Sequence, residues 1–302
     1  MSSSSSEARD SFLSFGFYSN LIQIATEESS LELTRAACNA LYSIFSNSEP
    51  IENEILIDIV PDLIKLLSLS DKVSITYIID CFVEMTNEYN QLVFNLFEFG
   101  IYPLSVEMLK DEELVGPTLR LIGNLSVAEP PQVKVLTEYG VLPILNDLLR
   151  SEYAADSFWV LSNLVEKIPD EIIPCCNSDF IQEVIDIISS SGFDVQKQGL
   201  YFLCTLILSL TNENLPLFMN QEIINILEQM INCGEEKFVI KCLDTLIKFL
   251  SYTHENLESS SSFFSSLMES DLKENLYELM EQETKQIAVK ATYLMGLLDD
   301  IE

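Results

Sequence analysis

Histidine is almost absent from this chain of 302 residues, since His254 is the single one. This excludes a histidine-rich metal site, and a catalytic triad would have to be built around that one residue. His254 lies in the polar run 252–256, which predicts a loop and a solvent-exposed histidine without a catalytic role. No other pair of a nucleophile and a base stands out. We therefore expect no enzyme, no catalytic residue, no metal site and no cofactor.

Basic residues are also scarce: 16 lysines and arginines stand against 48 aspartates and glutamates, which gives a net charge of −32. No two basic residues are adjacent, so the sequence has no basic stripe for the phosphates of nucleic acid or of an anionic membrane. We expect neither as a partner. The acidic excess favours a basic partner, although it would also serve solubility alone.

Sequence signals for export, membrane insertion and redox chemistry are missing. The seven cysteines include no C-x-x-C pair, and their odd number in a chain of this length predicts reduced, intracellular thiols. The longest apolar run, roughly residues 200–210, is shorter than the about 20 residues that a bilayer crossing needs. The serine-rich start, Met1–Ser6, has no apolar core, and we expect no signal peptide.

What the chain does have is a large apolar fraction, 48%, in a helical pattern. Segments such as Val141–Leu149 and Ile181–Ile188 place apolar residues three and four positions apart. Clean alternation of apolar and polar residues, typical of strands, is absent and glycine is scarce. The pattern predicts an all-α protein with a large core.

A repeat of about 42 residues runs through the sequence. Three helix starts share a proline, at Pro61, Pro103 and Pro143, with spacings of 42 and 40. Proline is accepted in a first helical turn because its missing N–H would be unpaired there. A second helical motif begins at positions 39, 80, 120, 159, 201 and 244, with spacings of 39 to 43. This period, with about three helices per unit, is in the armadillo/HEAT range and predicts one right-handed α-solenoid of about seven three-helix repeats, which we expect to be armadillo repeats.

The repeat pattern also sets the expected domain boundaries. Residues 1–15 are rich in serine and predict a disordered tail. Residues 16–251 hold the repeats, and residues 252–270 predict a polar, serine-rich loop. Residues 271–302 predict a helical pair that caps the C-terminal end of the stack.

Two segments of the array are more specific than the repeat itself. Residues 117–125 (PTLRLIGNL) and 156–164 (DSFWVLSNL) resemble the importin-α family of nuclear-import adaptors. Most repeats of that family carry a tryptophan and, one turn later, an asparagine on the concave helix, and one repeat carries arginine instead, followed by Gly-Asn. Both forms have a counterpart in this chain. The resemblance covers about residues 31–250 and implies a divergent, shortened member, since the family's earlier repeats would lie before residue 30.

The resemblance implies a peptide-binding groove. In the family, tryptophan faces hold the stems of lysine or arginine, asparagine amides hold the peptide backbone, and acidic residues pair with the cations. Tyr201 stands at the tryptophan position of the next repeat and can also stack on a basic side chain. The site residues implied here are Arg120, Asn124, Asp156, Trp159, Asn163 and Tyr201.

Other repeats depart from the family pattern. The tryptophan position is filled by Asn39, Asp80, Tyr201 and Asp244, and the asparagine position by Ser43, Glu84, Thr205 and Lys248. The residues that keep the family's peptide-binding types lie around the position of its minor, C-terminal peptide site. Two alternatives stay open at this point: Trp159 as a core residue, and Arg120 as a member of a surface ion pair.

The function that the resemblance implies is non-enzymatic. It is an adaptor, in the cytoplasm and nucleus, that binds basic nuclear-localisation peptides of cargo proteins for import. An importin-β-type carrier or an export factor is a further implied partner, but the basic N-terminal arm of the family is missing, since Arg9 is the only basic residue before Arg35. The alternative is an armadillo scaffold for protein partners that has no role in nuclear import.

Overall fold

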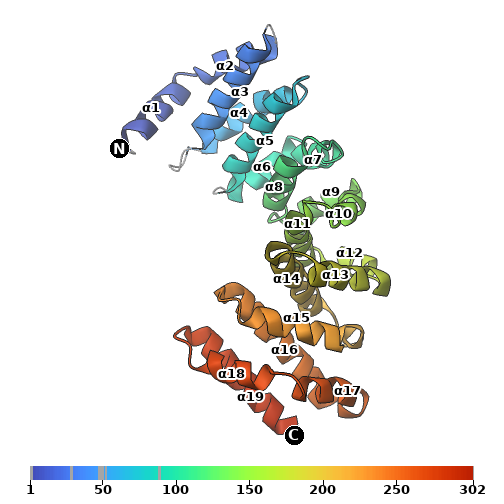
Figure 1. The fold of residues 1–302 in the computed structure, drawn as a ribbon. Helices are drawn as coiled ribbons and strands as arrows, with labels where there is room; N and C mark the ends of the chain where they lie inside the picture. Colours follow the sequence, from blue (N-terminus) through green and yellow to red (C-terminus); the bar gives the residue numbers. More distant parts are fainter. Residues whose placement is uncertain (1–2, 28–29, 47–50, 52, 88–89, 302) are drawn as a thin grey trace. The chain divides into compact units, whose positions relative to one another are not determined.

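The computed structural model describes residues 3–27, 30–46, 51, 53–87 and 90–301, and all regular structure in these ranges is helical (Figure 1). The predicted all-α fold is confirmed. The chain groups into two compact units, Met1–Asp147 and Leu148–Glu302, each with its own stack of helices. Helix α10 (Val141–Leu148) reaches the boundary between them.

The first unit stacks its long helices in chain order: α3 packs against α5, and α5 against α8. Other helices form a second row, in which α4 contacts α6 and α7 contacts α9. The bounds are α1 (Ser3–Ser14), α2 (Tyr18–Glu27), α3 (Leu31–Phe45), α4 (Asn53–Leu66), α5 (Lys72–Asn87), α6 (Asn90–Glu98), α7 (Ile101–Met108), α8 (Val115–Leu125) and α9 (Pro130–Glu138).

The second unit repeats this plan: α11 packs against α14, α14 against α16 and α16 against α19, while α15 contacts α13, α17 and α18. The α-helix bounds are α11 (Ala154–Lys167), α12 (Pro169–Ile172), α13 (Ser178–Ser190), α14 (Phe193–Ser209), α15 (Gln221–Ile231), α16 (Glu236–Glu255), α17 (Leu257–Met268), α18 (Leu272–Met280) and α19 (Lys285–Ile301). Two short 3₁₀ turns, η1 (Ile173–Cys175) and η2 (Leu215–Phe218), join the helices.

The sequence motif with a period of about 40 lies on the long helices. Positions 39, 80 and 120 fall on α3, α5 and α8, and positions 159, 201 and 244 fall on α11, α14 and α16. Within each unit, residues one repeat apart in sequence therefore come to lie on neighbouring helices of the stack. This relation fixes which side chains can share a pocket.

Two of the predicted helix starts are borne out by the backbone. Gly100 and Gly140 have φ of 75° and 86°, in the left-handed region that favours glycine, and α7 and α10 begin directly after them. Pro103 is thus in the first turn of α7, as expected. Pro61 is not at a helix start: α4 begins at Asn53, and the proline lies inside the helix on an exposed position.

Helix also forms where the sequence suggested a tail and a loop. Residues 3–14 of the expected tail form α1, while Met1 and Ser2 lie outside the described residues. The expected loop over 252–270 is occupied by the end of α16, with His254 exposed on it, and by α17. In α17, Phe263 and Leu267 lie four positions apart and are both buried, which stabilises a serine-rich helix by packing. The other domain boundaries stay predictions, including the capping role of α18 and α19.

Polar bridges cross between successive repeats at about the same period. They join Arg35 to Asp71 (2.7 Å), Lys72 to Asp111, Lys197 to Glu235 (2.8 Å) and Lys290 to Asp244, which are 36 to 46 residues apart in sequence. Lys248 instead donates to the carbonyls of Leu208 (2.9 Å) and Leu210 (2.7 Å) at the end of α14. Scarce cations thus hold neighbouring repeats of an acidic chain together.

Gly199 offers a test of core packing. A Cβ at this position of α14 would lie 2.6 Å from Ile188 Cγ1 and 3.1 Å from Phe158 Cε2. We expect Gly199→Ala to destabilise the protein by about 1–3 kcal/mol, because overpacking forces core side chains off their rotamers. Urea denaturation followed by circular dichroism measures this. The control is Gly296→Ala in α19, where no atom lies within 4 Å and where alanine should add about 0.5–1 kcal/mol. A gain in stability at both positions would contradict the packing described.

Candidate functional site

The two predicted site residues of the first unit lie on α8. Arg120 is half exposed, and its Nη2 donates to Asp80 Oδ1 of α5 at 2.9 Å. Burial raises the pKa of Asp80, although the arginine opposes this rise. The surface ion pair that the sequence left open is therefore the arrangement observed, and it links two adjacent repeats.

Asn124 faces the preceding repeat. Its Nδ2 donates to the backbone carbonyl of Val83 at 3.1 Å and to Thr86 Oγ1 at 3.0 Å, both near the end of α5. The N–H groups of the Asn124 amide thus donate to partners within the protein. Lys248 stands at the same motif position and also binds the helix end of the preceding repeat. The position implied to bind a peptide backbone can thus serve to join repeats.

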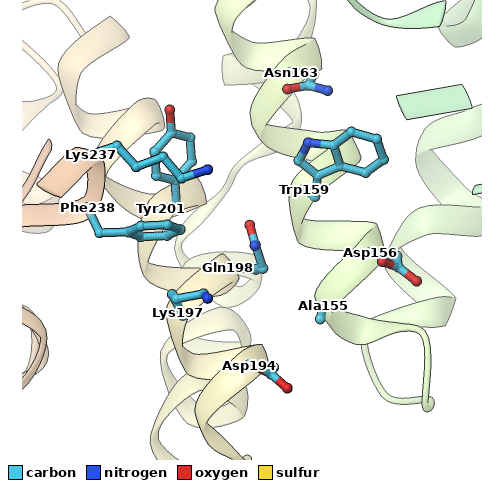
Figure 2. Close-up of a pocket in the computed structure, with 10 residues that line it drawn as sticks. All are labelled: Ala155, Asp156, Trp159, Asn163, Asp194, Lys197, Gln198, Tyr201, Lys237 and Phe238. Atoms are coloured by element: carbon cyan, nitrogen blue, oxygen red, sulfur yellow. The ribbon is translucent and has the colours of Figure 1, made fainter. Parts of the chain in front are cut away.

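The second unit brings four predicted residues into one pocket (Figure 2). The cavity volume is about 570 Å³. From α11 come Ala155, Asp156, Trp159 and Asn163; from α14 come Asp194, Lys197, Gln198 and Tyr201; from α16 come Lys237 and Phe238. Three consecutive long helices therefore each contribute one wall. Arg120 and Asn124 of the first unit are not part of its lining.

Trp159 lies on the open face of α11. Its side chain is half-buried and lines the pocket, whereas the neighbouring Phe158 and Val160 are fully buried in the core. Asp156 and Asn163, three residues before and four after, lie on the same face of the helix. The indole is therefore not a core residue, and it is flanked by a carboxylate and an amide.

Tyr201, on the next helix, already has a cation against its ring. The Nζ of Lys241 lies 4.5 Å from the ring centroid of Tyr201 and 2.6 Å from Glu166 Oε1. Burial lowers the pKa of Lys241, but the hydrogen bond to Glu166 and the other raising contacts together outweigh burial, and the pKa is raised overall. Tyr201 also meets Phe238 edge to face, with ring centroids 5.1 Å apart. The position that a ligand lysine would take on Tyr201 is filled by the chain itself.

Two further lysines near this wall were missed by the reasoning from sequence. Lys197 Nζ lies 5.4 Å from the ring centroid of Phe238 and 2.8 Å from Glu235 Oε1, a bond that raises the pKa of the lysine. Lys237 Nζ lies 5.2 Å from the same ring. The signal available in the sequence was their separation of 40 residues, which is the repeat period.

Within the described ranges, no three or more side chains of His, Cys, Asp or Glu gather where they could hold a metal ion. None of the described helices combines the length and the apolar character needed to cross a bilayer.

Comparison with solved structures shows the fold of the protein. An engineered protein superposes with a TM-score of 0.72 over 93% of this chain and 68% of its own, at 16% sequence identity. A designed armadillo-repeat protein gives 0.66 over 79% of this chain and 99% of its own, at 15% identity. Another, in complex with the peptide (KR)4, gives 0.64 over 79% and 98%, at 17% identity. No family model matches the sequence. The chain therefore has an armadillo-repeat fold, which confirms the predicted solenoid.

Comparison with curated sequences gives the particular resemblance. Importin subunit alpha-3 of Arabidopsis thaliana is 22% identical over 250 residues, covering 81% of this chain and 47% of the relative. Importin subunit alpha-1b of Oryza sativa subsp. japonica is 22% identical over 302 residues, covering 96% and 56%. The chain spans about half the length of these relatives. By sequence the chain is distantly similar to importin-α subunits, and by structure it is an armadillo-repeat solenoid.

The two bonds of Asn124 generate a test of its role. We expect Asn124→Ala to lower stability by about 1–2 kcal/mol, because Val83 and Thr86 lose a partner at a half-buried joint between repeats. Thermal and urea denaturation measure the change. Asn39→Ala serves as the control, since Asn39 is an exposed residue of the same motif on α3, and it should leave stability within about 0.5 kcal/mol. An Asn124→Ala variant as stable as the wild type would show that the amide does not hold the repeats.

Proposed function

We propose that this chain is a non-enzymatic adaptor that binds an extended basic peptide of a cargo protein in the pocket of the second unit. The observation that carries the proposal is the placement of Trp159 between Asp156 and Asn163 on the open face of α11, within a cavity wide enough for a side chain. The peptide chemistry is that of a nuclear-localisation segment, and the process is protein import into the nucleus.

Each of the three side chains has a role in such binding. The indole face of Trp159 attracts a lysine or arginine laid across it, by about 0.5–2 kcal/mol. The carboxylate of Asp156 pairs with the same cation and speeds its encounter with the pocket. The amide of Asn163 can donate to and accept from a peptide backbone, which sets direction and register. No step of covalent chemistry is required.

The comparisons support this proposal from two sides. The sequence relatives are importin subunits by name, and a structural neighbour with the same fold was solved with a peptide of alternating lysine and arginine. By extension we propose that the chain acts in the cytoplasm and nucleus, with an importin-β-type carrier or an export factor as a second partner. These further roles rest on the relatives, of which the chain spans about half.

A second candidate is an armadillo scaffold that holds a protein partner outside nuclear import. Two observations favour it. Arg120 is paired with Asp80, and the hydrogen donors of Asn124 are engaged within the protein, so two of the residues implied to bind peptide have other partners. Such a scaffold would use contacts other than the indole of Trp159.

Trp159 is the only tryptophan of the chain, so its fluorescence reports on the pocket alone. We expect a short lysine-containing peptide to change this fluorescence and, when labelled, to gain anisotropy with micromolar affinity that falls between low and high salt. Trp159→Ala should weaken binding about 2- to 30-fold, as expected for losing a cation–π contact. Asn163→Ala should weaken it too.

The matched control is Tyr139→Ala, which removes an exposed aromatic residue outside the pocket and should leave affinity unchanged. Absence of binding, or binding that both pocket variants retain, would refute the adaptor. Binding of a folded protein partner that ignores Trp159→Ala would support the scaffold instead.

A further inference from the structure

The walls of the pocket differ in charge. The α11 wall carries Asp156 beside Trp159, whereas the α16 wall carries Lys237 beside Phe238, and Figure 2 shows these two walls on opposite sides of Gln198. A pocket for a run of basic residues would need acidic or neutral groups on both sides. The two sides of this pocket therefore carry opposite charges.

Lysines of the chain already lie against the aromatic rings of the Tyr201 side. Lys241 lies over Tyr201, and both Lys197 and Lys237 lie within 5.4 Å of the Phe238 ring centroid. A ring face occupied by one cation cannot stack on a second without bringing two like charges together. In the half of the pocket that holds Tyr201 and Phe238, lysines of the chain itself therefore occupy the positions where a ligand cation would bind.

Two of these lysines form ion pairs within the chain, whereas the third forms none with the residues that the structure describes. Lys241 is paired with Glu166 at 2.6 Å and Lys197 with Glu235 at 2.8 Å. Lys237 is exposed and makes no ion pair with any residue in the described part of the chain. Its ammonium group is therefore available to an anionic group of a ligand and repels a cationic one.

We propose that the pocket selects a peptide of mixed charge, with one lysine or arginine on Trp159 and Asp156, and one anionic side chain paired with Lys237. Lys237 is then a specificity-determining residue. The proposal rests on the proposed function for its basic half and adds the anionic half. If it holds, a continuous run of lysines binds more weakly than a peptide with a single lysine that is followed or preceded by an acidic residue.

The spacing of the two charges follows from the repeat geometry. Packed helices lie about 8–10 Å apart, so α11 and α16, two steps apart in the stack, are separated by about 16–20 Å. An extended peptide rises about 3.3 Å per residue, and long side chains shorten the distance to be covered. We expect the cation and the anion to lie about three to six residues apart.

The test is a set of peptides that carry one central lysine in a neutral background. A second position, three to six residues away on either side, holds glutamate, phosphoserine, alanine or lysine. Affinity is measured by the fluorescence anisotropy of the labelled peptides, which also reports on the Trp159→Ala variant. At the best spacing we expect the order anionic, then alanine, then lysine, with steps of about 1.5- to 5-fold, as for exposed ion pairs. The stronger of the two anionic peptides tells a carboxylate from a phosphate.

A charge reversal makes the test specific. In Lys237→Glu the order should invert, so that the peptide with two lysines binds more tightly than the peptide with glutamate. Lys285→Glu is the control: it makes the same charge change at an exposed position of α19 that does not line the pocket, and the original order should persist. Circular dichroism verifies that both variants are folded.

The outcomes separate the two claims. If a single lysine binds in a Trp159-dependent manner but an anion adds nothing at any spacing, the mixed-charge proposal is wrong and the proposed function stands. The mixed-charge proposal is equally wrong if Lys237→Glu leaves the order of the peptides unchanged. If no peptide binds, or Trp159→Ala has no effect on any of them, both proposals fail.

Discussion

The burial of each long helix against the next is the interaction on which this protein depends. A single repeat has too few apolar residues on one face to form a closed core, so α3 needs α5, α11 needs α14, and α16 needs α19. This stacking converts a period in the sequence into a row of side chains in space within each unit. The pocket of the second unit is one product of that row, and the polar bridges between residues 36 to 46 positions apart are another.

This chain has three times as many acidic as basic residues, so the positions of its few cations matter for stability. Many of them bind at the joints between repeats, where they offset the repulsion of the acidic surface and satisfy helix ends. The motif position that holds Asn163 in the pocket holds Asn124 and Lys248 at two such joints. One position of the repeat thus lines the pocket in one place and joins neighbouring repeats in others.

The fold could be predicted from the sequence because period and helical pattern are local signals. The position of Trp159 in the groove was implied by the resemblance around Asp156 and Asn163, while a core position stayed open. The cation on Tyr201 was missed although Lys241 follows the tyrosine by 40 residues, one repeat, whereas its partner Glu166 is 75 residues from Lys241 and meets it only through the stack. The α17 helix was missed since a run of serines hides the spacing of Phe263 and Leu267. Pro61 lies inside α4, so a proline at this motif position does not always mark a helix start.

The bond from Lys248 to the carbonyls of Leu208 and Leu210 has a consequence for the order of events during synthesis. The end of α14 is completed by a side chain that leaves the ribosome about 40 residues later, which at about 5–20 residues per second is a delay of about 2–8 s. Asn124 places the end of α5 in the same situation. Each of these two helices therefore leaves the ribosome before the side chain that satisfies its last carbonyl groups.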